Sequence, residues 1–186
     1  MTIHEFYDKL VSALSTAAIP EHIRTEKDFE REFVIPIALQ VSGHRKDVHV
    51  YSHPWNNKER CQPDCQTARE HGQTAVGCPR CWAESKKWAS VLAFGTHHTF
   101  DLVAKDASGE TLAVEMKFVA PKGGRMPNGE IQRLMGQCTL AKTKHQFVIG
   151  VCGYRGSLDP RWDNDTQAVR SWSEQAGISL IFRAIG

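Results

Sequence analysis

Hydrophobic residues near the start of the chain recur every three or four positions, which predicts two amphipathic helices. The first helix runs from Ile3 to Ala17 and ends before Pro20. The second begins after Thr25, which has Asp28 three residues on as in a capping box, and its apolar stripe runs from Phe29 to Val41. Each helix therefore has one face to bury against another layer.

Alternating or continuous apolar runs predict the strands. A short strand is expected at 48–52, and runs at 99–105 and 111–120 are joined by a turn around Ser108 and Gly109. Two further strands follow at 146–154 and 178–185. The middle pair should form a hairpin, because only a tight turn separates its two runs.

Helical spacing returns between these strands. It is found at 82–94, at 131–138 and in a stretch that opens after Asp159 and Pro160 and is capped by Gly177. The order of helices and strands predicts an α/β fold, a central mixed β-sheet flanked by helices with the hairpin strands at its middle.

Residues 53–79 have no periodicity and are rich in Cys, Pro, Gly and Gln. Within them and just beyond, Cys61 and Cys65, then Cys78 and Cys81, make two close pairs separated by twelve residues. This spacing is typical of a tetrahedral Cys₄ zinc site, with an iron–sulfur cluster or two reduced structural pairs as the alternatives. Four thiolates leave no open position, so the zinc is expected to be structural. We predict an inserted zinc-binding subdomain at 53–92.

Length and composition favour an ordinary globular protein. The 186 residues suit a single domain, and 41% hydrophobic with 24% charged residues excludes disordered and fibrous classes. The net charge of +2 neither requires nor excludes a polyanionic partner. No signal peptide and no long apolar span is evident, so a cytoplasmic protein without a membrane is expected. Cys138 and Cys152 lie in core-type elements and are expected to act as small hydrophobic residues.

The strand at 111–120 carries two charges where burial is expected. Side chains alternate along a strand, so Glu115 and Lys117 share one face with Ala113 and Val119, while Val114, Met116 and Phe118 line the other. A Glu and a Lys at this spacing are often a solvated edge pair. Apolar neighbours weaken that interpretation, because a desolvated acid and amine need partners or a metal.

A third charged group joins this pair if the hairpin loop is 107–109 with Gly109 in a left-handed conformation. Asp106 then pairs with Glu110, and Asp101 falls opposite Glu115. Two close carboxylates repel unless a cation lies between them, and hard oxygen ligands favour Mg²⁺ or Mn²⁺. The chain contains neither GxGxxG nor GxxxxGK[ST], which argues against dinucleotide and P-loop chemistry.

These residues resemble the PD-(D/E)xK nuclease superfamily, which includes many restriction and repair endonucleases. The resemblance rests on Asp101, on Glu115-Met116-Lys117 in the next strand, and on a following helix with Gln132 and Gln137, and it covers roughly residues 25–42 and 97–154. Two features depart from the pattern: Phe100 replaces the proline, and about forty residues separate the first strand from the hairpin.

The resemblance implies a restriction endonuclease-like core and a role for each residue. Asp101 and Glu115 would bind Mg²⁺ or Mn²⁺, and Lys117 would orient or activate the attacking water. A glutamate of the preceding helix would assist, with Glu30 the first choice and Glu26 the second. Gln132 would hydrogen-bond a phosphate or the lysine, although an exposed helix glutamine is often only a good helix former.

Basic residues suggest where a nucleic acid would bind. Lys122 and Arg125 lie in a Gly- and Pro-rich loop that leaves the strand of Glu115, and further basic residues flank the cysteines, namely Lys58, Arg60, Arg80, Lys86 and Lys87. A solvated helix face is the alternative for the second group.

We therefore predict a Mg²⁺-dependent nuclease, a hydrolase acting on DNA. The first alternative is a catalytically inactive, zinc-containing nucleic-acid-binding module. The second is another metal hydrolase that uses His97 and His98. A second copy of the chain, in a homodimer, is a partner that the sequence leaves open.

Overall fold

The computed structural model of the chain describes residues 1–43, 48–52, 89–160 and 162–185. Its helices are α1 (Ile3–Thr16), α2 (Glu26–Phe29), the π-helix η1 (Glu30–Val34), α3 (Ile35–Val41), α6 (Asn128–Lys142) and α7 (Trp162–Gln175). Its strands are β1 (Val48–Ser52), β2 (Ser90–Ala93), β3 (Thr96–Thr99), β4 (Leu102–Asp106), β5 (Thr111–Val119), β6 (Phe147–Arg155) and β7 (Ser179–Ile185).

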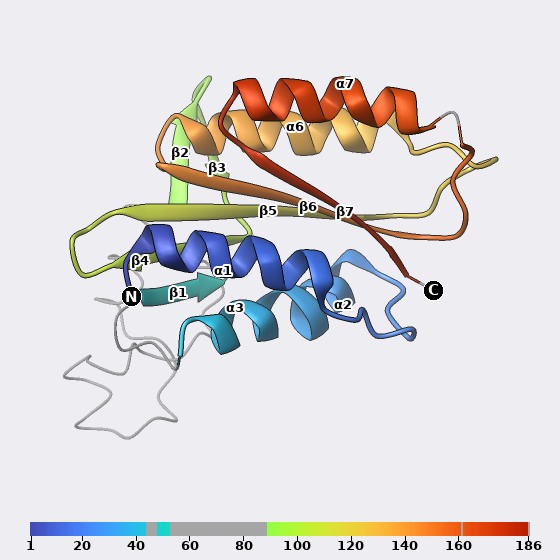
Figure 1. The fold of residues 1–186 in the computed structure, drawn as a ribbon. Helices are drawn as coiled ribbons and strands as arrows, with labels where there is room; N and C mark the ends of the chain where they lie inside the picture. Colours follow the sequence, from blue (N-terminus) through green and yellow to red (C-terminus); the bar gives the residue numbers. More distant parts are fainter. Residues whose placement is uncertain (44–47, 53–88, 161, 186) are drawn as a thin grey trace.

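The expected α/β class with a mixed central sheet is confirmed. The five-stranded sheet has the order β1-β4-β5-β6-β7. Strand β4 is antiparallel to both β1 and β5, whereas β5, β6 and β7 are parallel to one another. Figure 1 shows α1, α2 and α3 on one side of this sheet and α6 and α7 on the other. In the described part of the chain, no helix is long and apolar enough to cross a membrane.

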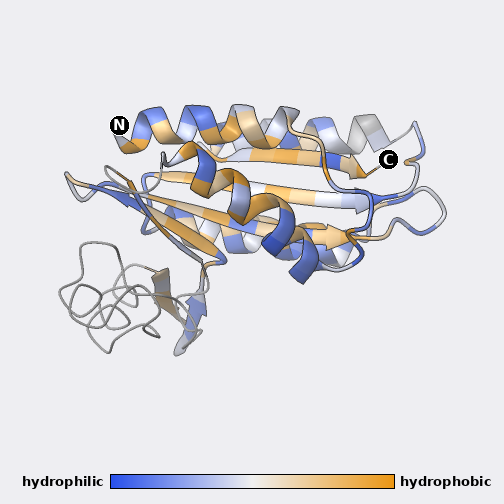
Figure 2. Cartoon of the chain, turned by 90° about the horizontal axis from the view of Figure 1, so that it is seen from below, coloured by the Kyte–Doolittle hydropathy of each residue, from blue (hydrophilic) through white to orange (hydrophobic). Residues whose placement is uncertain are grey.

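Each face of the sheet has its own hydrophobic core. Val114 and Met116 of β5 pack with α1 and α3, while Ala113 and Val119 pack with α6. Figure 2 shows the strands between these layers as largely hydrophobic. Strand β5 is therefore buried on both faces, as its sequence predicted, and any charge on it lies in a core. Cys138 and Cys152 are buried on the α6 side as the expected small hydrophobic residues.

The second predicted helix is one continuous run made of α2, η1 and α3. It starts with the predicted capping box, because the Thr25 side chain accepts from Asp28 N–H and the Asp28 carboxylate accepts from Thr25 N–H. Phe29 packs against Gly153 of β6, where a Cβ would lie only 2.7 Å from the ring. This close approach seats the start of the helix against the sheet next to β5.

The predicted hairpin register is confirmed. Leu102 pairs with Val114 and Lys105 with Thr111, so the residue before Leu102, Asp101, comes opposite Glu115. Gly109 has a φ of +92°, and Asp106 N–H donates to Glu110 C=O at 3.1 Å. The strand expected at 99–105 is interrupted, however, because β3 ends at Thr99 and β4 begins at Leu102.

The helix expected at 82–94 is wrong from Ser90 onward. Residues 90–93 form β2, which pairs antiparallel with β3 in a separate two-stranded sheet. Its turn consists of Phe94 and Gly95, both with positive φ, and this geometry suits a two-residue hairpin loop. Phenylalanine is rare in such a turn, so local sequence indicated a continuing helix.

Candidate active site at the open edge of strand β5

Strand β5 extends beyond the start of its neighbour β4. Their pairing ends at Leu102 and Val114, so within the described residues no strand pairs with that edge of β5 from Glu115 onward. Two carboxylates occupy this edge instead. Met116 N–H donates to Asp101 Oδ2 at 2.9 Å, and Phe118 N–H donates to Glu26 Oε2 at 3.4 Å. The strand end thus gathers acidic side chains from the β3–β4 connection and from α2.

Glu115 lies in the middle of this edge and is fully buried, with 0% of its surface exposed. Neither of its carboxylate oxygens has a hydrogen-bond partner. A buried carboxylate without a donor is costly, by about 1–3 kcal/mol or more. Such a group is expected where a cation compensates for the lost hydration.

The environment of Glu115 raises the pKa of its carboxyl well above the ordinary value. Burial is the main cause, followed by the negative charge of Asp101, and Lys117 opposes both. The Asp101 carboxylate therefore lies near that of Glu115, and two ionised carboxylates at short range repel each other unless a proton or a cation lies between them.

Lys117 follows two residues later on the same face of β5 and is 7% exposed. Its Nζ donates to Glu26 Oε1 at 3.0 Å. Glu26 is the first residue of α2, so the capping box at Thr25 and the packing of Phe29 on Gly153 hold it in place. The helix thereby fixes the direction of the amine at the strand edge.

Asp101 and Glu115 fit a hard divalent cation. In the described part of the chain, no group of three or more His, Cys, Asp or Glu side chains could hold a metal ion. A cation at this site would therefore have Asp101 and Glu115 as its protein ligands. Mg²⁺ is commonly held by one or two carboxylates together with water and substrate phosphate oxygens. The unpartnered oxygens of Glu115 are the structural feature that matches this need.

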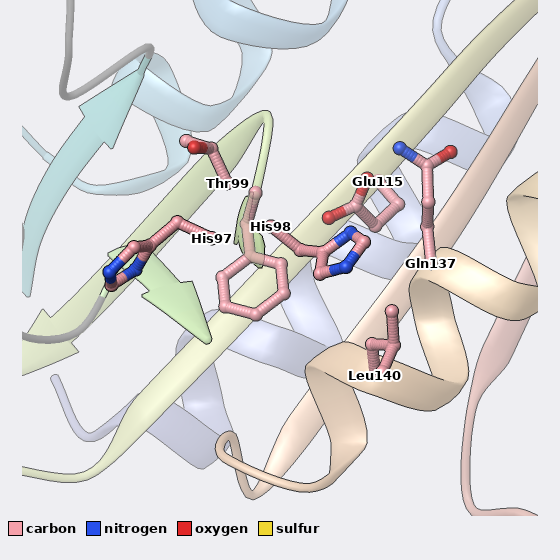
Figure 3. A pocket seen from close by; sticks show the side chains of 7 residues that line it. His97, His98, Thr99, Glu115, Gln137 and Leu140 are labelled. Carbon is pink, nitrogen blue, oxygen red and sulfur yellow. The ribbon is translucent and has the colours of Figure 1, made fainter. Parts of the chain in front are cut away.

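A pocket of about 210 Å³ opens beside Glu115. Figure 3 shows His98 pointing toward Glu115 and Gln137, while His97 points the other way. The remaining lining residues are Thr99, Phe100 and Leu140. Gln137 Oε1 is buried in this region without a hydrogen-bond partner. The pocket is a polar recess next to the carboxylates, built by β3, β5 and α6.

The two residues predicted to assist the reaction, Glu30 and Gln132, differ from the glutamate that contacts Lys117 and the glutamine that lines the pocket. Glu30 is buried in η1, but the glutamate that contacts Lys117 is Glu26, the second choice. Gln132 is exposed on α6 and does not line the pocket, whereas Gln137, one and a half turns later, does. Asp101, Glu115 and Lys117 are brought together as the sequence predicted.

The loop after β5 is a tight turn. Lys122 N–H donates to Arg125 C=O at 2.9 Å and Arg125 N–H donates back to Lys122 C=O at 3.1 Å, across Gly123 and Gly124. Both basic side chains are exposed. The zinc prediction at Cys61, Cys65, Cys78 and Cys81, and the basic residues that flank these cysteines, lie outside the described residues.

The chain was compared with models of protein families, with curated proteins and with solved structures, and none of these comparisons found a match.

Proposed function

We propose that the chain is a Mg²⁺-dependent DNA endonuclease with a restriction endonuclease-like core and an inserted Cys₄ zinc subdomain at 53–92. The observation that supports this most is Glu115, fully buried with both oxygens unpartnered, beside Asp101 and Lys117 at one strand edge. Two carboxylates and an amine are the side chains that metal-assisted phosphodiester hydrolysis requires.

Each residue has a distinct part in the proposed reaction. Asp101 and Glu115 would hold the cation, whose positive charge would lower the pKa of water and offset the charge gained by the phosphate. Lys117 places an ammonium two residues from Glu115, where it can orient the attacking water. Glu26 positions this amine through its 3.0 Å contact with Nζ.

Two observations favour a nucleic acid as the substrate. Lys122 and Arg125 are exposed in the turn that follows the strand of Glu115, where they can meet a phosphate backbone. The polar pocket with Gln137 and His98 opens beside the same carboxylate and offers room for part of a nucleotide. An inactive binding module would also explain the basic turn and the pocket, but it would not explain why two carboxylates lie together beside them.

The alternative of a hydrolase that uses His97 and His98 as metal ligands finds less support. Both histidines line the pocket, but they occupy consecutive positions of β3, and consecutive side chains of a strand point to opposite faces. His97 also points away from Glu115 (Figure 3).

The proposal is tested by incubating the purified chain with supercoiled plasmid, linear duplex and single-stranded DNA, each with Mg²⁺, with Mn²⁺ and with EDTA. We expect metal-dependent cleavage of at least one substrate. Binding to DNA without cleavage under any metal would favour the inactive binding module, and cleavage that persists in EDTA would contradict the metal-dependent mechanism.

A further inference from the structure

The hairpin formed by β2 and β3 presents apolar side chains to solvent. Among the described residues, the large hydrophobic side chains that are exposed are Leu92, at 62%, and Phe94, at 99%. Both lie at the tip of this hairpin, which stands away from the five-stranded sheet in Figures 1 and 2. Two large apolar side chains exposed together at one hairpin tip make this tip a candidate contact surface.

The backbone makes this placement more costly. Phe94 has a φ of +51°, whereas the other described residues with positive φ are glycines. Asn or Gly would suit a two-residue turn of this kind better, because a bulky side chain at positive φ is strained. Hairpin formation therefore gains nothing from phenylalanine at this position.

The base of the hairpin is fixed to the candidate active site. Phe100 N–H donates to Ala89 C=O at 3.0 Å, and Lys144 Nζ of the α6–β6 connection donates to Ser90 C=O at 2.6 Å. His98 and Thr99, on the strand that returns from the tip, line the pocket with Glu115. Strand β3 thus runs from the tip to the pocket beside the candidate catalytic carboxylate.

The chemistry of the hairpin narrows the class of partner. Residues 89–100 contain no acidic side chain, and the polar residues next to the tip are threonine and histidine. An aromatic ring with hydroxyl and imidazole groups behind it suits a polyanion that also presents flat, uncharged faces. Nucleobases offer such faces, and stacking on an aromatic side chain contributes about 1–3 kcal/mol per base.

We propose that the β2–β3 hairpin is a base-contacting element, in which the Phe94 ring stacks against nucleobases of the strand whose phosphate lies at Glu115. The inference rests on the proposed function, since it takes the substrate to be a nucleic acid. Contacts to phosphate groups alone would not require an exposed aromatic ring, because a phosphate is bound through its charge. The ring would hold bases near the carboxylates while Lys122 and Arg125 contact the backbone.

The test measures binding without cleavage. Wild type, Phe94→Asn and Phe94→Trp are titrated in EDTA with a single-stranded oligonucleotide that contains 2-aminopurine, a base whose fluorescence reports stacking. Asparagine suits the turn, so Phe94→Asn removes the ring without unfolding the hairpin. We expect Phe94→Asn to bind about 5- to 150-fold more weakly, Phe94→Trp to bind as wild type does, and the fluorescence change to be lost only with asparagine.

The salt dependence distinguishes stacking from charge. Phe94→Asn should leave the slope of log affinity against log salt unchanged, because no phosphate contact is lost. Equal affinity and equal fluorescence change for wild type and Phe94→Asn would overturn the inference. So would a loss of self-association in Phe94→Asn with unchanged oligonucleotide binding, which would assign the tip to a second copy of the chain.

The inference and the proposed function fail in different ways. If wild type binds with a Phe94-dependent signal but never cleaves, the base contact holds and the catalytic proposal fails. If wild type cleaves DNA and Phe94→Asn binds equally well, the nuclease proposal holds and the base contact fails. If wild type binds no oligonucleotide at all, the base contact is overturned, and the cleavage assay decides the nuclease proposal separately.

Discussion

Glu115 has its pKa raised well above the ordinary value, first by burial and then by the charge of Asp101. A carboxyl whose pKa is higher in the folded than in the unfolded state stabilises the fold below the unfolded pKa, and this contribution is lost as pH rises through the folded pKa. The metal-free protein should therefore be less stable at alkaline than at mildly acidic pH. A bound cation would remove this cost, because it favours the ionised form.

Glu115→Gln should stabilise the metal-free protein. The amide has nearly the same shape and carries no charge, so we expect the variant to exceed wild type by roughly 1–3 kcal/mol at pH 8 and by much less near pH 5. Urea unfolding in EDTA at several pH values measures this difference. A gap between variant and wild type that does not widen with pH would contradict the burial of an unpartnered carboxylate.

The pKa of Asp106 is shifted in the opposite direction from that of Glu115. Burial raises the pKa of its carboxyl, but hydrogen bonds from Ser108 and from the N–H groups of Ile3 and Glu110 outweigh burial, and the pKa is lowered overall. These bonds join the start of α1 to the β4–β5 turn. The stability that they supply is present above the unfolded pKa and is lost as pH falls through the lower folded pKa.

Asp106→Ala should therefore lower the free energy of unfolding at pH 7 by about 2–3 kcal/mol, the scale of hydrogen bonds to a charged group. Asp8→Ala is the matched control, because Asp8 is an exposed residue of α1 that pairs with exposed His4. Thermal or urea unfolding should separate the two variants clearly. Similar stability for both would mean that Asp106 does not link these elements.

Single residues differ in how far sequence could place them. Strand alternation and the hairpin turn placed Asp101, Glu115 and Lys117 together, because both are local rules. Local rules could not predict which of Glu26 and Glu30 contacts Lys117, since this depends on how α2 packs against the end of β5. Gln137 could have been preferred to Gln132, because it adjoins the buried stripe of Leu134, Cys138 and Ala141 on α6.

At the scale of elements, the turn after β5 is the best-defined basic feature. Its two backbone hydrogen bonds hold Lys122 and Arg125 side by side and exposed. A preformed turn loses little conformational entropy when it meets a phosphate backbone. These side chains should therefore add to affinity through charge and take no direct part in the chemistry.

Lys122→Ala and Arg125→Ala should each weaken DNA binding and reduce the salt slope by roughly 1. Cleavage at saturating DNA should persist. Titration of a labelled duplex in EDTA at several salt concentrations measures the slope, with Lys9→Ala, an exposed lysine of α1, as the control. A slope equal to that of wild type would show that the turn does not contact phosphates.

Elements were predicted well where the hydrophobic pattern was long and regular. The register of β4 and β5 followed from one glycine, and the limits of α1, β6 and β7 were within about two residues of the prediction. The β2–β3 hairpin was missed, because Val91, Leu92 and Phe94 also fit a helical stripe and its turn uses phenylalanine at positive φ.

At the scale of the whole molecule, the sheet separates two cores and the candidate site lies at the edge of one strand between them. The helical run 26–41 on one face contributes Glu26, and α6 on the other contributes Gln137. Sequence could predict these layers, since they follow from element order. It could not predict the meeting point of the two helices with β5, which depends on packing such as that of Phe29 on Gly153.

Zinc binding by the four cysteines would contribute directly to the folding free energy of the whole molecule. The purified chain should carry close to one zinc per molecule, and Cys61→Ser or Cys78→Ser should lower both zinc content and stability. Cys138→Ser, at a buried cysteine of α6, is the control and should keep its zinc. Iron in elemental analysis, or freely reactive thiols without metal, would contradict a zinc site.

The most direct test of the nuclease centre is the single-turnover rate of Mg²⁺-dependent DNA cleavage by wild type and by Lys117→Ala, with Lys9→Ala as a lysine control. We expect Lys117→Ala to stay folded and to bind DNA but to lose activity by at least about a hundredfold, the low end for a residue acting on the attacking group. Asp101→Ala and the double variant Asp101→Ala/Lys117→Ala should be about equally inactive, since the groups act as a unit. Cleavage by Lys117→Ala at the wild-type rate would rule out this role for Lys117 and place the catalytic centre elsewhere.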